Sequence, residues 1–267
     1  MKIIDFHTHV FPPELAPRAI KLLIDNAAPT TVMKNHTDGT INGLLESMRR
    51  GGVDTSVTMA IATKPSQVAT INRECVQNQY GGIVRFGTLH PDTEDFAAQI
   101  DFLAAGGIRG IKFHPEYQTF YITDKKLYPI YEKLAASGFA VLFHSGKDPG
   151  PFTNDHALPP DLRKIREDFP TLKIIAAHMG GWKVWDDVEK ILAGLDIYFD
   201  TAAIYKWLPP EDFVRLVRKH GVEKILFGSD SPWYDQKECV EWIKSSGLND
   251  TELEAVFCGN AEKLLEL

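Results

Sequence analysis

Short apolar runs alternate along the chain with longer stretches in which apolar residues recur every three to four positions. The short runs, rich in β-branched and aromatic residues, predict buried strands, and the periodic stretches predict amphipathic helices. Eight runs have the character of strands: residues 2–6, 55–61, 83–89, 108–113, 140–143, 173–177, 197–199 and 224–227. Apolar strands separated by helices predict a parallel sheet whose faces are covered by helices.

Helices are expected between these strands and after the last one, and six of them end at glycine, which stops a helix. The expected ranges are 14–25, 41–50, 65–80, 92–105, 124–136, 160–169, 184–193, 210–220, 237–246 and 251–267. Eight strand–helix units in 267 residues favour a closed (β/α)₈ TIM barrel over an open doubly wound sheet. We expect one domain that spans residues 1–267.

Composition excludes several classes of function. The net charge is −7 and the basic residues are scattered, which argues against nucleic-acid binding. No apolar run approaches the roughly 20 residues that cross a bilayer, so we expect no membrane partner. The first residues lack the apolar segment of a signal peptide, and the three cysteines lie far apart in expected helices. We interpret them as packing thiols and expect a cytoplasmic protein.

Histidines gather where the expected strands end. Six of the nine do so: His7, His9, His90, His114, His144 and His178. An isolated His-x-His pair is more often an ordinary pair of histidines than a metal site, but packing alone gives no reason to place histidines at one end of successive strands. In a barrel the active site lies at the carboxyl ends of the strands. His7 and His9 share one face of their strand by alternation, as two imidazole ligands of Zn²⁺ require.

Several motifs together resemble the amidohydrolase superfamily, in the branch related to aminocarboxymuconate-semialdehyde decarboxylase. The motifs are Asp5-Phe6-His7-Thr8-His9, Gly110-Ile111-Lys112-Phe113-His114-Pro115, His144, His178-Met179-Gly180-Gly181, Gly228-Ser229-Asp230 and Gly259-Asn260-Ala261. The resemblance covers the whole chain and is specific as a set. It implies a divalent metal, one Zn²⁺ with Mn²⁺ as the alternative, whose ligands are His7, His9, His144 and Asp230.

The implied roles agree with the chemistry of these side chains. Three imidazoles and a carboxylate suit Zn²⁺, which lowers the pKa of a bound water to about 7. Asp230 is expected to act as the general base. His178 is expected to be a second catalytic residue that polarises a substrate oxygen, or a ligand if two metals bind.

The fourth strand leaves three interpretations open. Lys112 and His114 share one face, and we expect them to bind an anionic group of the substrate. Alternatively, Lys112 bridges two metals after carboxylation, or Lys112 forms a structural ion pair and His114 caps the next loop.

The expected enzyme is a metal-dependent hydrolase of a small ester, lactone or amide. The alternative is a metal-dependent non-oxidative decarboxylase of an aromatic or unsaturated carboxylic acid, which would use the same ligands. A barrel with a purely structural metal is the third hypothesis, and buried polar groups without a function argue against it, because they cost stability. The expected partner is a small molecule, anionic or cyclic, and a homodimer fits the base rate for oligomers.

Overall fold

The computed structural model describes residues 1–266. Its eight strands pair in chain order, each parallel to the next. They are β1 (Ile4–Thr8), β2 (Thr55–Met59), β3 (Ile83–Thr88), β4 (Gly110–Phe113), β5 (Ala140–Phe143), β6 (Lys173–Ala176), β7 (Tyr198–Asp200) and β8 (Ile225–Leu226). Each overlaps an expected strand, and β5 matches its expected range in full.

Hydrogen bonds between the first and last strands close the sheet. The Phe6 amide donates to the Phe227 carbonyl at 2.7 Å, and the Asp230 amide donates to the His7 carbonyl at 2.9 Å. Thr8 and Ser231 form a further parallel bridge. The expected (β/α)₈ barrel is therefore confirmed, and its closure brings the first strand next to the last.

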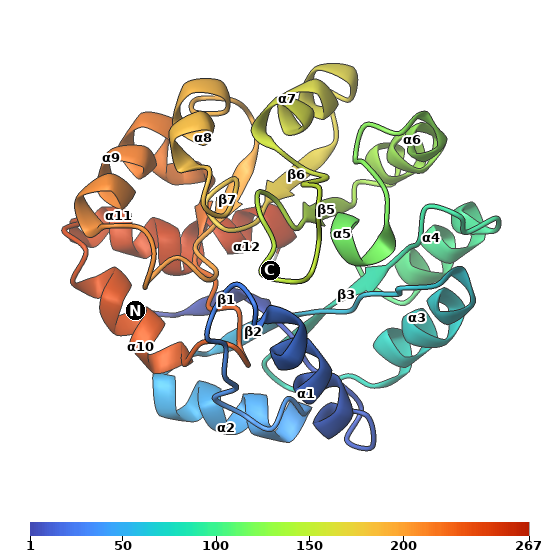
Figure 1. The fold of residues 1–267 in the computed structure, drawn as a ribbon, viewed down its shortest axis with the longest axis horizontal. Coiled ribbons are helices and arrows are strands. Elements are labelled where there is room, and N and C mark those ends of the chain that lie inside the picture. The colour runs from blue at the N-terminus through green and yellow to red at the C-terminus, as the bar shows by residue number, and fades with distance from the viewer. Residues whose placement is uncertain (267) are drawn as a thin grey trace.

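Helices surround the barrel (Figure 1). They are α1 (Ala16–Ala27), α2 (Ile41–Gly51), α3 (Val68–Gln77), α4 (Phe96–Ala105), α5 (Pro115–Gln118), α6 (Tyr128–Ala136), α7 (Pro159–Asp168), α8 (Trp185–Ile191), α9 (Pro210–His220), α10 (Gln236–Lys244), α11 (Asp250–Glu254) and α12 (Asn260–Leu265). The helix expected over 65–80 is a 3₁₀ turn (Pro65–Gln67) followed by α3, and a π-helical turn (Ala255–Gly259) separates α11 from α12. The short helix α5 was not expected.

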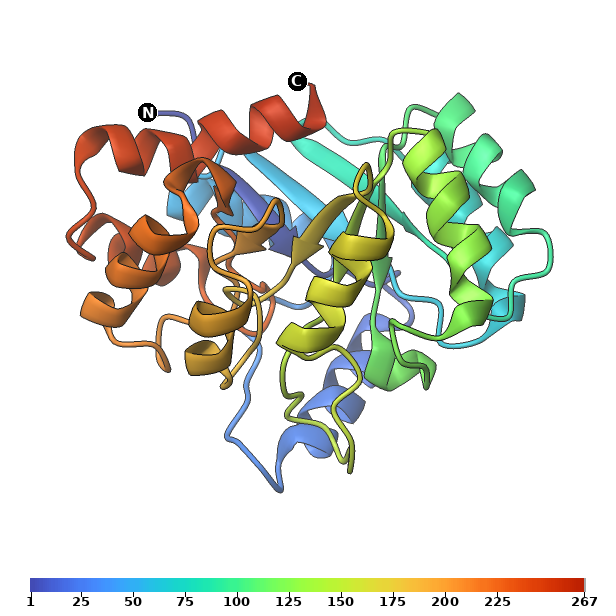
Figure 2. The same ribbon diagram turned by 90° about the horizontal axis from the view of Figure 1, so that it is seen from above.

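Apolar side chains fill the inside of the barrel. They include Phe6, Phe86 and Leu142, and two residues of α12, Ala261 and Leu264, belong to the same cluster. A side chain at Gly110 would clash with the Phe86 ring, since a Cβ there would lie 2.2 Å from it. Figure 2 shows α12 across one end of the barrel, with both termini on that side. Because the apolar side of α12 covers this end, a polar site is left to the opposite end.

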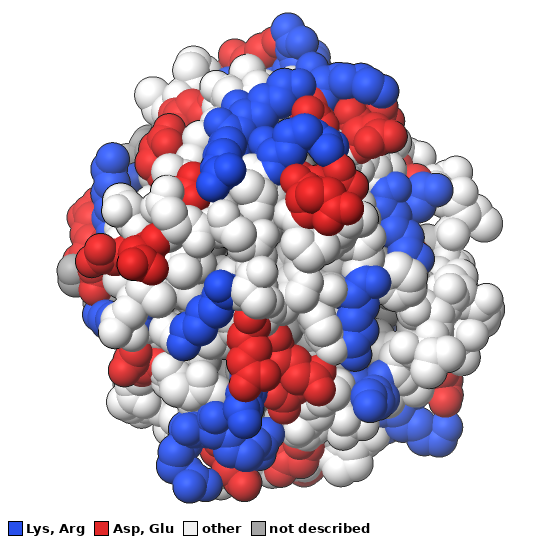
Figure 3. Space-filling model, turned by 90° about the vertical axis from the view of Figure 1, so that its left-hand side faces the viewer, with Lys and Arg blue, Asp and Glu red and all other residues white. Residues whose placement is uncertain are grey.

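Helix α1 and the loop after β5 project from that opposite, carboxyl end of the barrel (Figure 2). The Thr30 hydroxyl donates to the Pro149 carbonyl, so the chain after α1 contacts this loop. On the face built by α8 to α11, basic and acidic side chains lie side by side (Figure 3), and Arg218 with Glu252 is one such pair. Over residues 1–266, no helix combines the length and apolarity that crossing a membrane requires.

Candidate metal centre

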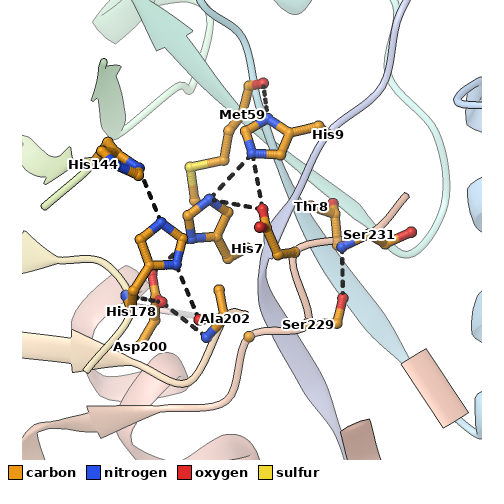
Figure 4. Close-up of polar contacts among 12 residues, drawn as sticks. His7, Thr8, His9, Met59, His144, His178, Asp200, Ala202, Ser229 and Ser231 are labelled. Atoms are coloured by element: carbon orange, nitrogen blue, oxygen red, sulfur yellow. Dashed lines mark hydrogen bonds and ion pairs between the residues drawn. The ribbon is translucent and has the colours of Figure 1, made fainter. Parts of the chain in front are cut away.

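Three side chains converge where β1 and β8 end. His7 Nε2 lies 3.2 Å from His9 Nε2. Asp230 Oδ1 lies 3.6 Å from His7 Nε2 and 3.3 Å from His9 Nε2. The pairing of β1 with the segment after β8 brings Asp230 here. Figure 4 shows the two imidazoles with these nitrogens turned toward each other.

The outer nitrogens of these two imidazoles identify their tautomers. His7 Nδ1 lies 2.8 Å from Asp200 Oδ2, and His9 Nδ1 lies 3.3 Å from the Met59 carbonyl. A carboxylate and a carbonyl only accept hydrogen bonds, so both Nδ1 atoms carry the hydrogen. Burial lowers the pKa of His7 to about 3 and also lowers that of His9, so both rings are neutral at pH 7. Both Nε2 atoms therefore present bare lone pairs.

His144 and His178 repeat this arrangement. His178 Nδ1 donates to the Ala202 carbonyl at 3.0 Å, and His144 Nε2 donates to the Lys147 carbonyl at 3.2 Å. The remaining nitrogens, His178 Nε2 and His144 Nδ1, face each other at 3.0 Å (Figure 4). The ring centres of His178 and His7 lie 5.3 Å apart, so the pair His144–His178 and the pair His7–His9 form one cluster.

The cluster has the character of a site for a cation. Four imidazole lone pairs and the Asp230 carboxylate face inward, and such groups repel one another unless a positive charge lies between them. Neutral imidazoles with a carboxylate are a donor set for Zn²⁺ or Mn²⁺. Of the expected ligands, His7, His9 and Asp230 have their donor atoms within 4.8 Å of one another, whereas His144 lies next to His178 and outside that group.

Asp230 acts on the buried amine of Lys112, since its negative charge opposes the lowering of the Lys112 pKa by burial. Asp230 also has a positive φ of 69°, and His178 one of 60°. Left-handed backbone at residues other than glycine costs free energy and concentrates at functional sites.

Asp200 is a site residue that sequence reasoning missed. It is the last residue of β7 and fully buried. Besides holding His7, its Oδ1 accepts the amides of His178 at 2.9 Å and Ala202 at 3.0 Å. One carboxylate thus orients the ring of His7 and the backbone of His178, as the partners of metal ligands often do. A carboxylate directly at the end of the seventh strand was the signal in the sequence.

Asp5 holds the first and last strands in register. This buried carboxylate accepts the Ser229 amide at 2.9 Å, the Gln236 side chain at 2.7 Å and the His7 amide at 3.2 Å. These bonds tie β1 to the segment that carries Asp230.

Lys112 reaches the cluster from β4. Its side chain is buried, and Nζ lies 3.4 Å from His7 Nε2. Burial lowers its pKa to about 8, against the opposing effect of Asp200 and Asp230. Without metal, the amine is therefore mainly protonated at neutral pH.

His114 lies one layer further out. Its ring stacks on that of His144, with centroids 4.3 Å apart and planes 8° apart. Its Nδ1 lies 3.5 Å from Glu116 Oε2 and its Nε2 3.4 Å from Asp148 Oδ2. Both nitrogens face carboxylates of the protein, and the predicted role of His114 in substrate binding stays a prediction. Asp148 was not anticipated from the sequence.

Comparison with known proteins agrees with this fold. A family model described as Amidohydrolase matches residues 4–267. Among curated proteins, none matches the chain significantly. An uncharacterized TIM-barrel protein from Bordetella bronchiseptica is 20% identical with a TM-score of 0.74, and the match covers 100% of this chain and 99% of that one.

Decarboxylases are among the similar structures. A 2,6-dihydroxybenzoate decarboxylase, solved with 2,6-dihydroxybenzoate, is 14% identical with a TM-score of 0.71 and full coverage of both chains. A 5-carboxyvanillate decarboxylase from Novosphingobium aromaticivorans, solved with manganese and a nitrobenzoic acid, is 13% identical with a TM-score of 0.74, covering 100% of this chain and 97% of that one. At such identities these likenesses show the fold. The family match over nearly the whole chain shows more: this protein is an enzyme of the amidohydrolase family.

Proposed function

We propose that the protein is a metal-dependent, non-oxidative decarboxylase of an aromatic or unsaturated carboxylic acid. The metal would be held by His7, His9, His144 and Asp230, with Zn²⁺ and Mn²⁺ both suited to this donor set. Two decarboxylase structures that share the fold, both solved with an aromatic acid, support this proposal over the hydrolysis that the sequence favoured.

The buried ammonium of Lys112 carries the proposal. Its charge is influenced by four carboxylates (Asp200, Asp230, Glu116 and Asp148), but among residues 1–266 none of them lies within 4.0 Å of Nζ. A buried positive charge is costly without a partner, and a substrate carboxylate would supply one. The neutral carbonyl of an ester or lactone would not.

The metal, when bound, would supply positive charge that orients the substrate carboxylate and a neighbouring oxygen. Lys112 binds the carboxylate and keeps it in the buried site. The bond between this carboxyl group and the adjacent carbon breaks, CO₂ leaves, and the electron pair stays on the carbon. His178 or Asp230, which has first taken up a proton from solvent, then transfers that proton to the carbon, so that one proton is consumed in each turnover.

Hydrolysis of an ester, lactone or amide is the second candidate, supported by the family's own description. Asp230 would then take a proton from the attacking water, and Lys112 would face the developing negative charge on the carbonyl oxygen.

Metal analysis and a paired substrate screen test the proposal. We expect one equivalent of zinc or manganese in the protein, which His144→Ala and Asp230→Ala would lose. With hydroxybenzoates and unsaturated acids we expect CO₂ release by the metal-loaded enzyme. New carboxylate from esters or lactones without CO₂ would establish hydrolysis instead. Two equivalents of metal would support a carboxylated Lys112, and absence of binding after incubation with Zn²⁺ or Mn²⁺ would refute the metal centre.

A further inference from the structure

A groove outside the barrel runs between α8 and α9. Its volume is about 530 Å³, and it begins beside the loops that follow β5 and β6. Lys147 and Lys183, from these two loops, lie at this end. An apolar surface lines the rest, formed by Val184, Trp185, Leu208, Pro209 and Leu216.

The other charged side chains of the groove are mostly paired with one another. Arg215 binds Glu189 at 3.1 Å and also Asp212. Lys190 lies 3.9 Å from Asp187. Within residues 1–266, by contrast, no carboxylate lies within 4.0 Å of Lys147 or Lys183, and Asp186 is the one acid of the lining without an ion pair. The lining holds four bases and four acids, and the charges without an ion pair among residues 1–266 are Lys147, Lys183 and Asp186, so two of these three are positive.

Lys183 is held in place before any ligand arrives. Its φ is 59°, a left-handed conformation that is unfavourable for a side chain of this size. Its ammonium lies 4.2 Å from the ring centre of Trp182 and 4.0 Å from that of Trp207. Trp182 Nε1 donates to the Ala203 carbonyl at 3.3 Å, and Trp207 Nε1 donates to the Tyr234 hydroxyl at 2.9 Å. Two anchored aromatic rings thus restrict this ammonium through cation–π contacts.

The two lysines are close enough to repel. The charge of Lys147 adds to burial in lowering the pKa of Lys183. Two ammonium groups that face one groove without a carboxylate partner are stabilised when an anion binds between them.

We propose that this groove is a second ligand site, which binds a small organic anion. The carboxylate or phosphate group of the ligand lies between Lys147 and Lys183, and its apolar part rests on Leu208 and Leu216. The groove adjoins the metal centre, because the Lys147 carbonyl accepts the hydrogen of His144 and Trp185 donates to the His178 carbonyl, but the lysine side chains are not among the proposed metal ligands. The inference does not depend on the reaction proposed above.

Tryptophan fluorescence provides the assay, because Trp185 lines the groove and Trp182 and Trp207 flank Lys183. The probes are benzoate, phenyl phosphate and inorganic phosphate, with benzyl alcohol as the neutral analogue. We expect saturable binding of phenyl phosphate or benzoate by the metal-loaded protein. The relative affinities of phenyl phosphate and benzoate distinguish a phosphate site from a carboxylate site. The difference in affinity between phenyl phosphate and inorganic phosphate measures the contribution of the apolar surface.

Three substitutions at lysines of the groove separate the alternatives. We expect Lys147→Met and Lys183→Met each to weaken binding roughly tenfold or more, the loss of one charged hydrogen bond. Lys183→Arg keeps the charge and should retain most of the affinity. Lys190→Met is the matched control, since this lysine lines the same groove but is paired, and it should leave the affinity unchanged. Circular dichroism verifies that each variant is folded.

Several results would overturn the inference. One is equal binding of benzyl alcohol, which would identify an apolar site without charge selection. Another is binding that disappears when the metal is removed but survives both lysine substitutions, because the anion would then occupy the metal centre. The absence of saturation with every anion at millimolar concentration would also overturn it.

Discussion

Replacing Asp200 with asparagine tests how the site controls its ligands. In the wild type, Oδ2 accepts the hydrogen on His7 Nδ1, and Oδ1 accepts two backbone amides. The asparagine has the same shape but a single acceptor oxygen. If that oxygen keeps the amides of His178 and Ala202, the NH₂ group faces His7 Nδ1. His7 then moves its hydrogen to Nε2, and the lone pair that faces His9 and Asp230 is lost.

The free-energy cost of this substitution differs between the metal-free and the metal-bound protein. Without metal, a charged hydrogen bond becomes a neutral one, which costs about 1 kcal/mol. With metal, one ligand no longer donates. Loss of such an orienting partner lowers metal affinity about 10- to 100-fold, which corresponds to roughly 1.4–2.7 kcal/mol. The effect on metal binding should therefore exceed the effect on the metal-free fold.

Competition of the protein with a chelator for Zn²⁺ measures the affinity, and thermal unfolding with and without metal measures both stabilities. Asp196→Asn is the matched control, because this aspartate lies in the turn just before β7, is exposed and pairs with Lys224. We expect the control to bind metal normally. Wild-type affinity in Asp200→Asn, in a protein shown to be folded, would refute the proposed role of this carboxylate.

Three further predictions concern other parts of the molecule. Lys112→Met should retain the metal and raise the KM for the carboxylate substrate by about tenfold or more, because it removes the proposed partner of the substrate; an unchanged KM in steady-state assays would contradict this. Burial lowers the pKa of His220 in the folded protein, whereas in the unfolded chain this histidine binds a proton near pH 6.5. Below this pH the unfolded chain therefore holds more protons, and acidification should reduce the free energy of unfolding. Urea denaturation should show a weaker pH dependence for His220→Gln than for the wild type. Asn260→Ala should lower the free energy of unfolding by about 1–3 kcal/mol in the same experiment at pH 7. The reason is that the Asn260 side chain donates to the Val222 and Ile225 carbonyls at 2.7 Å. An unchanged free energy of unfolding would show that water replaces the amide group.

The sequence alone was sufficient for the architecture. The expected strand over 140–143 and the expected helix over 210–220 match β5 and α9, because the apolar pattern that defines them lies within each segment. The sequence also predicted that His7, His9 and His178 lie at strand ends, because the local apolar pattern determines where a strand ends. In a parallel barrel all of these ends meet on one side, so local information was enough to predict a site there.

Only the tertiary structure decided which side chains meet. Asp200 accepts a hydrogen bond from His7, which lies 193 positions away in the chain. The register of β7 and the closure of β1 against β8 produce this contact. Lys112 and His114 illustrate the same limit, because alternation placed both on one face. In the structure Lys112 reaches His7, while His114 pairs with Glu116 and Asp148. Periodicity gives the side of a strand on which a residue lies, but the partner it finds there depends on packing between segments far apart in sequence.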